Sequence, residues 1–258
     1  MKRVHGWIPD KPDFRDRKYA KIAPKYKASA LPSHFSLRKA MPPIINQDEL
    51  GSCTACAVST ILMYNRMKVN EKPKFRPSRL FIYYNERALE GTINYDAGAE
   101  IRSGIKTVAK TGFCSEDLWP YDLSKFKRKP PAQAYKNAVM YKSLEYYRIN
   151  NGKINNLKTC LVSGYPFVFG FTTYSSGEAA DRNGGYIPTP KTTDFSDGGH
   201  AVVCTGYDDE KGVFEIHNSW GTSVGDRGYY YLPYDYVTTT DLSDDCWTIR
   251  SIHETDNI

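Results

Sequence analysis

Residues 46–56 read Asn-Gln-Asp-Glu-Leu-Gly-Ser-Cys-Thr-Ala-Cys and join a polar loop to an apolar segment. Apolar residues then recur at helical spacing, which predicts a buried helix over residues 53–68 with Cys53 in its first turn. A helix N-terminus carries about half a positive charge, which stabilises a thiolate relative to a thiol. Gln47 lies in the preceding loop, from which its amide can point back toward Cys53. The stretch therefore combines a candidate nucleophile with a candidate hydrogen-bond donor.

Two later segments carry further residues suited to catalysis. Residues 197–203 read Asp-Gly-Gly-His-Ala-Val-Val, which places His200 at the entrance to an apolar strand. Residues 216–222 read Ile-His-Asn-Ser-Trp-Gly-Thr, which places Asn218 at a strand end before a large ring. Each segment alone has a structural explanation, because buried cysteines and histidines are common in protein cores. It is their combination with Cys53 that favours chemistry.

The order Gln, Cys, His, Asn, with 147 residues from Cys53 to His200 and 18 more to Asn218, resembles the papain-like cysteine peptidases. The resemblance covers about residues 31–255, and the Tyr95–Tyr121 stretch also looks like the family's substrate-binding region. It is similar to the members with a short pro-segment from microbes and large viruses. It implies an α+β, two-lobe fold with a helical N-terminal lobe, a β-barrel-like C-terminal lobe and the active site in the cleft between them.

The resemblance also implies roles for the residues. Cys53 would be the nucleophile and His200 its base, resting as a thiolate–imidazolium pair in which the thiol pKa is lowered. Asn218 would orient the His200 ring, and Gln47 with the backbone N–H of Cys53 would form the oxyanion hole. The expected reaction is endopeptidase hydrolysis through a thioester acyl-enzyme.

Four further residues are expected to contact the substrate: Gly98, Ala99, Ala201 and Trp220. Gly98-Ala99 aligns with the family's glycine pair, whose backbone would pair with an extended peptide, and Trp220 would shield the hydrogen bond of the catalytic histidine. Ala201, with Ile101 and Gly170, would line a second subsite for an apolar side chain two positions before the cut.

The hydrophobic pattern divides the chain into a helical part and a β-rich part. Helices are expected at residues 53–68, 79–89, 100–110, 130–138 and 155–161. Strands are expected at residues 140–149, 166–173, 200–207, 213–218, 229–232 and 247–253. We expect a catalytic domain over residues 31–258, with a helical lobe at about 45–138 and a β-rich lobe at about 139–255.

The formal net charge of +6 equals the charge of residues 1–30 alone. Residues 31–165 carry +10 and residues 166–258 carry −10, so they cancel. Residues 1–30 are a basic N-terminal extension with neither a helical nor an alternating period, and we expect an extended arm. We expect it to lie on the surface or across the cleft as a gate, attracted by the acidic half. His5, like His34 and His253, is expected at the surface.

No apolar run approaches the length of a membrane span, and residues 1–10 lack the apolar middle of a signal peptide. We therefore expect an intracellular, reducing location or a non-conventional export route, with six mostly free cysteines. The expected partner is a protein or peptide substrate, without an obligatory nucleic acid or a membrane. We expect a monomer that needs no metal and no cofactor.

Other functions remain open from the sequence. Cys53 and Cys56 form a Cys-x-x-Cys at a helix start, as in thiol oxidoreductases, but that reading leaves His200 and Asn218 unexplained. The pair could also form a reversible disulfide, although Cys56 is more simply a core thiol. Zinc binding lacks a second ligand pair. A catalytically silent papain-like binding or structural protein, or another acyl transfer such as deamidation or ligation, would use the same scaffold.

Overall fold

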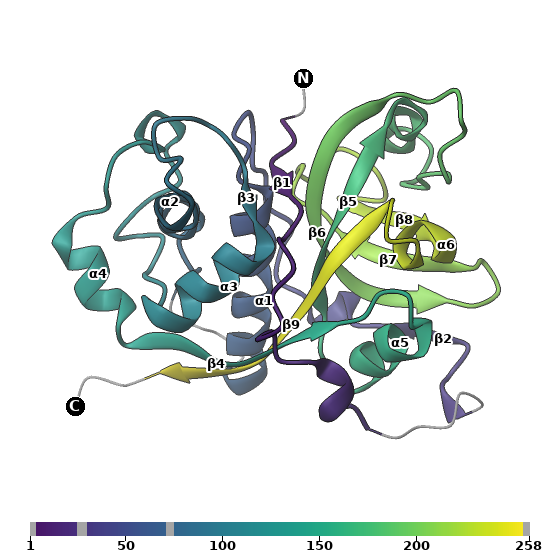
Figure 1. Cartoon of the computed structure of the whole chain (residues 1–258), viewed down its shortest axis with the longest axis horizontal. Helices are drawn as coiled ribbons and strands as arrows, with labels where there is room; N and C mark the ends of the chain where they lie inside the picture. The colour runs from purple at the N-terminus through teal and green to yellow at the C-terminus, as the bar shows by residue number, and fades with distance from the viewer. Residues whose placement is uncertain (1–3, 25–29, 71–74, 255–258) are drawn as a thin grey trace.

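The computed structural model describes residues 4–24, 30–70 and 75–254. The longest helix stands between a mainly helical side and a side that holds most of the strands together with the last helices of the chain (Figure 1). The helices are α1 (Cys53–Val69), α2 (Arg79–Glu90), α3 (Ile101–Lys110), α4 (Ala132–Ala138), α5 (Ile154–Val162) and α6 (Tyr234–Thr238). The strands are β1 (Trp7–Ile8), β2 (His34–Ser36), β3 (Ala99–Glu100), β4 (Tyr141–Ile149), β5 (Phe167–Tyr174), β6 (Ser196–Asp208), β7 (Val213–His217), β8 (Tyr229–Pro233) and β9 (Ser243–Glu254). The α+β, two-lobe fold class is confirmed.

Helix α1 is buried on all sides because it packs against α2 and α3 on one flank and against β6 and β9 on the other. Its polar side chains need partners at this depth. Thr54 donates to Glu86 Oε2 at 2.9 Å, Ser59 to the carbonyl of Pro77 at 2.7 Å, and Asn65 to the carbonyl of Ile249 at 2.8 Å. These bonds fix α1 against both halves of the molecule, and with it the position of Cys53.

The β-rich half is one seven-stranded sheet in the order β4-β9-β5-β6-β7-β8, to which β2 adds by pairing with β6. Residues 200–207 of β6 are buried on both faces, because α1 covers one face and a second hydrophobic cluster covers the other. The apolar run after His200 therefore reads as a doubly covered strand rather than an alternating one. The His200 side chain on this strand is fully buried and packs against Phe171 and Trp220.

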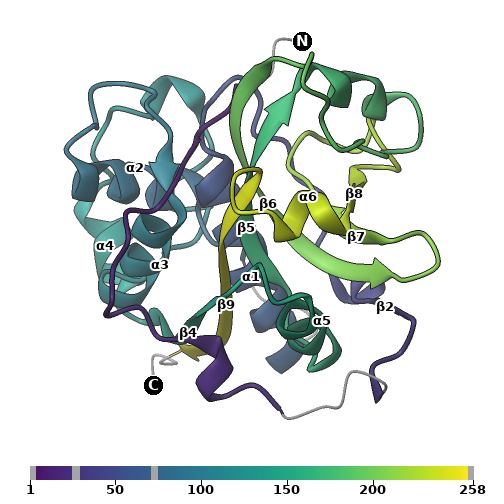
Figure 2. The ribbon, with the colours of Figure 1, turned by 45° about the vertical axis from the view of Figure 1, so that its right-hand side comes forward.

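The predicted helices and long strands all occur, with ends displaced by a few residues. The short strands β1, β2 and β3 were missed, since two or three residues show no period. The arm was also predicted incompletely: β1 pairs in parallel with β3, Trp7 is 8% exposed and Tyr19 is fully buried. Figures 1 and 2 show the arm descending between the two halves and passing over α3 toward β4.

Within the described ranges, no helix is both long and apolar enough to cross a bilayer. All six cysteines are buried free thiols, as expected for most of them. Cys56 contacts Ser52 Oγ at 3.7 Å and belongs to the interior of α1.

Candidate active site

The structure brings Cys53, His200 and Asn218, three of the four predicted catalytic residues, to the junction of α1 and the sheet. Cys53 opens α1, and its thiol is hydrogen-bonded to backbone of Ala201, the residue after His200 on β6. His200 Nε2 donates to Asn218 Oδ1 at 2.8 Å, and this oxygen also accepts from the Ser219 N–H at 2.7 Å. With the amide held in this way, Asn218 can fix the plane of the His200 ring.

Trp220 covers the histidine. Its ring stacks on that of His200 with centroids 4.4 Å apart and an interplanar angle of 18°. A stacked indole excludes water from the ring and from the hydrogen bond that orients it.

Gln47 belongs to the same hydrogen-bond network as Asn218 and His200. Its Oε1 accepts from Ser219 Oγ at 2.7 Å, and its Nε2 donates to the carbonyl of Leu50 at 3.0 Å. Because Ser219 also bonds Asn218, one chain of hydrogen bonds joins Gln47 to His200. The amide NH₂ is thereby presented beside the first turn of α1.

Gly98, Ala99 and Ala201, which were predicted to contact substrate, lie next to the arm or next to Cys53. Ala99 lies in β3, and Gly98 before it has a φ of +73°, which favours glycine. Ala201 is paired with Gly170 across β6 and β5. Ala201 thus lies directly beside Cys53, whereas Ala99 approaches it through the arm, because Gly6 contacts both.

Comparison with known proteins identifies the scaffold. A family model described as papain family cysteine protease matches residues 31–248. The chain belongs to the papain family of cysteine proteases. It is 39% identical, over 98% of its length and 88% of the relative, to a peptidase C1-like protein of Acanthamoeba polyphaga mimivirus.

Solved structures agree with this assignment. The crystal structure of xylellain, a cysteine protease from Xylella fastidiosa, superposes on this papain-family chain with a TM-score of 0.86 at 42% identity, covering 97% of this chain and 98% of that one. The Carica candamarcensis cysteine protease CMS1MS2, solved in complex with E-64, shares the fold at a TM-score of 0.60 and 18% identity, over 88% of this chain and all of that one. This protein is therefore a cysteine-type peptidase by family and by fold.

In this papain-family protease the arm occupies the cleft. Gln47 Nε2 donates to the carbonyl of Val4 at 3.2 Å, and the Cys53 thiol is hydrogen-bonded to backbone of Gly6. A Cβ on Gly6 would lie 1.9 Å from the carbonyl oxygen of Gly51, so only glycine allows the chain to come this close. The Ala99 N–H donates to the Gly6 carbonyl at 2.8 Å.

The pKa of the covered thiol is raised in this arrangement. Burial raises the pKa of Cys53 to about 12, outweighing the backbone hydrogen bonds from Ala201 and Gly6 that lower it. The expected lowering of this pKa is therefore not found with the arm in place, because burial outweighs the hydrogen bonds to the sulfur.

The arm docks through charges opposite to those expected. Among the described residues, its ion pairs with the body come from its carboxylates: Asp16 lies 2.7 Å from Arg102 and 3.3 Å from Arg148, and Asp13 lies 3.8 Å from Lys106. Arg102 belongs to α3 and Arg148 to β4. The expectation that the basic surplus of the arm holds it to the acidic half is therefore wrong for these contacts.

His5 corrects a second expectation, since it lies in the cleft and not at an open surface. Its Nδ1 donates to the Asp197 carbonyl at 2.7 Å, and its ring centroid lies 6.1 Å from that of His200 and 6.4 Å from that of Trp220. It lines a cavity of about 510 Å³ together with Phe171 and Trp220, which pack against the His200 ring. His34 and His253 are exposed as expected.

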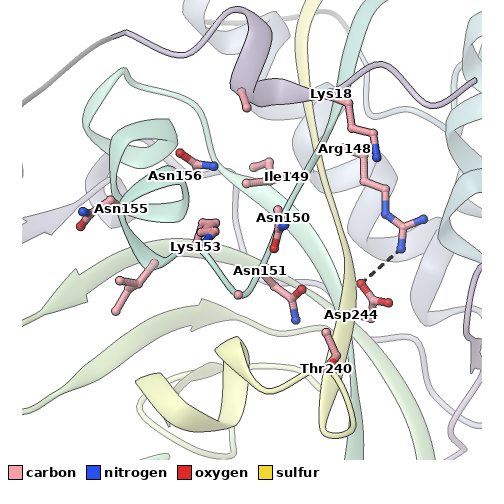
Figure 3. Close-up of a pocket in the computed structure, with 13 residues that line it drawn as sticks. Lys18, Arg148, Ile149, Asn150, Asn151, Lys153, Asn155, Asn156, Thr240 and Asp244 are labelled. Atoms are coloured by element: carbon pink, nitrogen blue, oxygen red, sulfur yellow. Dashed lines mark hydrogen bonds and ion pairs between the residues drawn. The ribbon is translucent and has the colours of Figure 1, made fainter. Parts of the chain in front are cut away.

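A separate pocket of about 820 Å³ lies where the arm crosses β4 at the start of α5. Figure 3 shows Lys18, Arg148 and several asparagines around it, with Arg148 reaching Asp244 at 3.2 Å. None of the predicted catalytic or substrate-contacting residues lines this pocket.

Sequence reasoning missed the docking residues Trp7 and Asp10. One signal was present: a tryptophan inside a polar, proline-rich segment has no local core to enter, so it marks a segment that docks elsewhere.

Proposed function

We propose that this protein is a cysteine endopeptidase that cleaves proteins or peptides with Cys53 as nucleophile and His200 as general base and acid. The observation that carries the proposal is the continuous set of contacts from Gln47 through Ser219 and Asn218 to His200, beside the thiol of Cys53. Each polar group required for acyl transfer occupies one connected site.

The steps follow from these positions. With the cleft open, the Cys53 thiol gives its proton to His200, and its sulfur attacks the peptide carbonyl carbon to form a C–S bond. The carbonyl oxygen takes the negative charge between Gln47 Nε2 and the Cys53 N–H. His200 then protonates the leaving amine as the C–N bond breaks. Water attacks the thioester, His200 accepts its proton, and the carboxylate product leaves as the thiol is restored.

We further propose that the arm is a gate that must leave before substrate binds. The carbonyl of Val4 lies on the Gln47 amide, where the substrate oxygen is expected, and Gly6 lies against the thiol. Parallel pairing with β3 lets the arm fill the site by its backbone. The described structure corresponds to the closed form.

The test compares Cys53→Ala with Cys56→Ala, two buried thiols one helical turn apart on α1. The full chain is incubated with a fluorogenic peptide and with an epoxysuccinyl label, in reductant, from pH 4 to 8. We expect turnover and a one-label mass increase in the wild type and in Cys56→Ala, and neither in Cys53→Ala.

Two results would contradict the proposal. Absence of turnover and labelling in the wild type, and also in variants that open the cleft, would indicate a silent scaffold. Loss of activity in Cys56→Ala with Cys53→Ala unaffected, or turnover that requires a Cys53–Cys56 disulfide, would instead favour thiol redox chemistry.

A further inference from the structure

The arm keeps its acidic and its basic side chains on opposite sides. The side chains of Asp10, Asp13 and Asp16 are 0%, 14% and 7% exposed, and each has an arginine or a lysine of the body within 4.0 Å. The basic residues of the same stretch are all exposed, namely Lys11, Arg15, Arg17, Lys18 and Lys21. Residues 10–21 therefore present positive charge outward, while their negative charge is neutralised against the body.

Most of the exposed cations do not hold the arm in place. Among the described residues, Lys11, Lys18 and Lys21 form no ion pair. Arg15 pairs with Asp13 of the arm itself at 2.7 Å, and its side chain remains 73% exposed. Single exposed lysines are ordinary surface residues. Here, however, five cations gather within eleven residues of a segment that binds the body through its acids, so their charge is left for a partner outside the molecule.

Phe14 adds an apolar ring to this charged surface. It is 94% exposed, the largest exposed fraction of any large hydrophobic residue in the described ranges. It stands in a turn in which the Asp16 N–H donates to the Asp13 carbonyl at 3.2 Å, and the carboxylates of both residues are anchored to the body. The ring therefore projects outward between two anchored residues. We call Phe14 and the five exposed cations the outer face of the arm.

We propose that the outer face of the arm docks onto the surface of a bilayer that contains anionic lipids. The cations lie against the charged lipid headgroups, and the Phe14 ring enters the headgroup region, because basic residues and exposed rings together favour this interface. Such docking needs no membrane-spanning helix. It goes beyond the proposed peptidase function, since Cys53 and His200 make their contacts with other residues.

The shape of the outer face favours a bilayer over a nucleic acid. Proteins that bind single strands hold the phosphate backbone in a positively charged groove and stack bases on aromatic side chains. Phe14 instead projects from a turn, and at 94% exposure it has no wall that could hold a base against its ring. A projecting ring between cations needs no groove to enter a headgroup layer.

The test measures binding of the full chain to vesicles that are collected by sedimentation. One set of vesicles is phosphatidylcholine alone, and the other is two parts phosphatidylcholine to one part phosphatidylserine. We expect the wild type to bind only the mixed vesicles. It should be released at about 1 M salt, where the Debye length is about 3 Å.

Two variants remove the two components of the outer face. Replacement of Lys11, Lys18 and Lys21 by glutamine in one chain should weaken binding on the order of a hundredfold, because each cation near an anionic surface contributes about fivefold. Phe14→Ala should weaken binding by about tenfold, since the ring loses its transfer out of water. Both variants change exposed side chains, and an unchanged thermal unfolding midpoint verifies their fold.

The matched controls remove the same kinds of group from the stretch around α4, which Figure 1 shows at the edge of the molecule away from the arm. Replacement of Lys127, Lys129 and Lys136 by glutamine removes three exposed cations and changes the net charge equally. Val139→Ala shortens an apolar residue that is 58% exposed. Both controls should bind the mixed vesicles nearly as the wild type does.

Three results would overturn the proposal. Equal losses in the two triple variants would show that binding follows net charge alone. Absence of binding to the mixed vesicles, or equal binding to phosphatidylcholine alone, would exclude an anionic bilayer as the partner. Tighter binding to single-stranded DNA than to the mixed vesicles, with vesicle binding unchanged in Phe14→Ala, would assign the outer face to a nucleic acid. The peptidase function is judged separately, by turnover of a fluorogenic peptide without vesicles.

Discussion

Replacing Trp7 by alanine should open the cleft, and the structure gives the size of the effect. Trp7 is 8% exposed, so docking buries nearly the whole of its side chain. An aromatic side chain of about 200 Å² at about 25 cal/mol per Å² corresponds to about 5 kcal/mol. Measured truncations of buried tryptophan fall at about 3–5 kcal/mol. Since about 1.4 kcal/mol is tenfold, Trp7→Ala should weaken arm docking by about a hundredfold to several thousandfold.

The assay follows steady-state turnover of a short fluorogenic peptide and the rate of labelling of Cys53 by an epoxysuccinyl reagent. Both should rise in Trp7→Ala to the ceiling set by a fully open cleft. Trp7→Phe retains a ring against Gly170 and Gly199 but loses the hydrogen bond to Asp245, so both rates should lie between those of the wild type and Trp7→Ala. Ile8→Ala is the matched control, because this neighbour is 39% exposed and its loss should leave both rates unchanged.

The reasoning is refuted if Trp7→Ala, with an unchanged thermal unfolding midpoint, turns over peptide and takes up label no faster than the wild type. A rise of similar size in Ile8→Ala would equally refute it, since the effect would then belong to any change in the arm.

Three further outcomes are expected. Gly6→Ala should raise turnover, because its Cβ would collide with the Gly51 carbonyl; lower turnover with normal folding would contradict the gate. Burial raises the pKa of Asp10 in the docked form. Burial, together with repulsion from Asp10, also raises the pKa of Asp245 to about 7, so the docked form binds more protons than the open form. Docking of the arm should therefore weaken as pH rises from 6 to 8, by at most about tenfold per proton and per pH unit. The measurement is the ratio of wild-type activity to Gly6→Ala activity, which should rise over this range. A ratio that does not change with pH would exclude the linkage. In the open Gly6→Ala background, Gln47→Ala should lower kcat by about 10²–10³-fold, whereas Gln133→Ala on the exposed face of α4 should not; equal effects would remove the oxyanion role.

The helices and the sheet were predictable because their apolar residues repeat with clear periods. α1 shows helical spacing from Cys53 onward, and β6 shows an apolar run after His200. The meeting of Cys53, His200 and Asn218 was also foreseeable, since the order and spacing of these residues resemble a known family. Local pattern and family resemblance together gave the scaffold and the centre of the site.

The arm could not be predicted in the same way. Each of its contacts joins one arm residue to a residue far away in the sequence. Gly6 lies against Gly51, the Trp7 indole lies against Gly170, and Asp16 lies between Arg102 and Arg148. None of these leaves a period in the sequence. Net charge pointed to the wrong contacts. Three buried or half-buried carboxylates of the arm make its ion pairs with the body, whereas exposed lysines contribute little to the free energy of docking. The contact between Asp245 and Trp7 was hidden for the same reason, because the two residues are 238 positions apart.

Asp16 has one consequence for the life of the enzyme. It accepts hydrogen bonds from Arg102 on α3 and from Arg148 on β4, and so clamps the helical side to the sheet. When the arm leaves, this clamp goes with it, and the two sides are held by one fewer bridge. The open, active form is then also the less stable form. Each activated molecule is therefore expected to unfold and lose activity sooner than the closed form does.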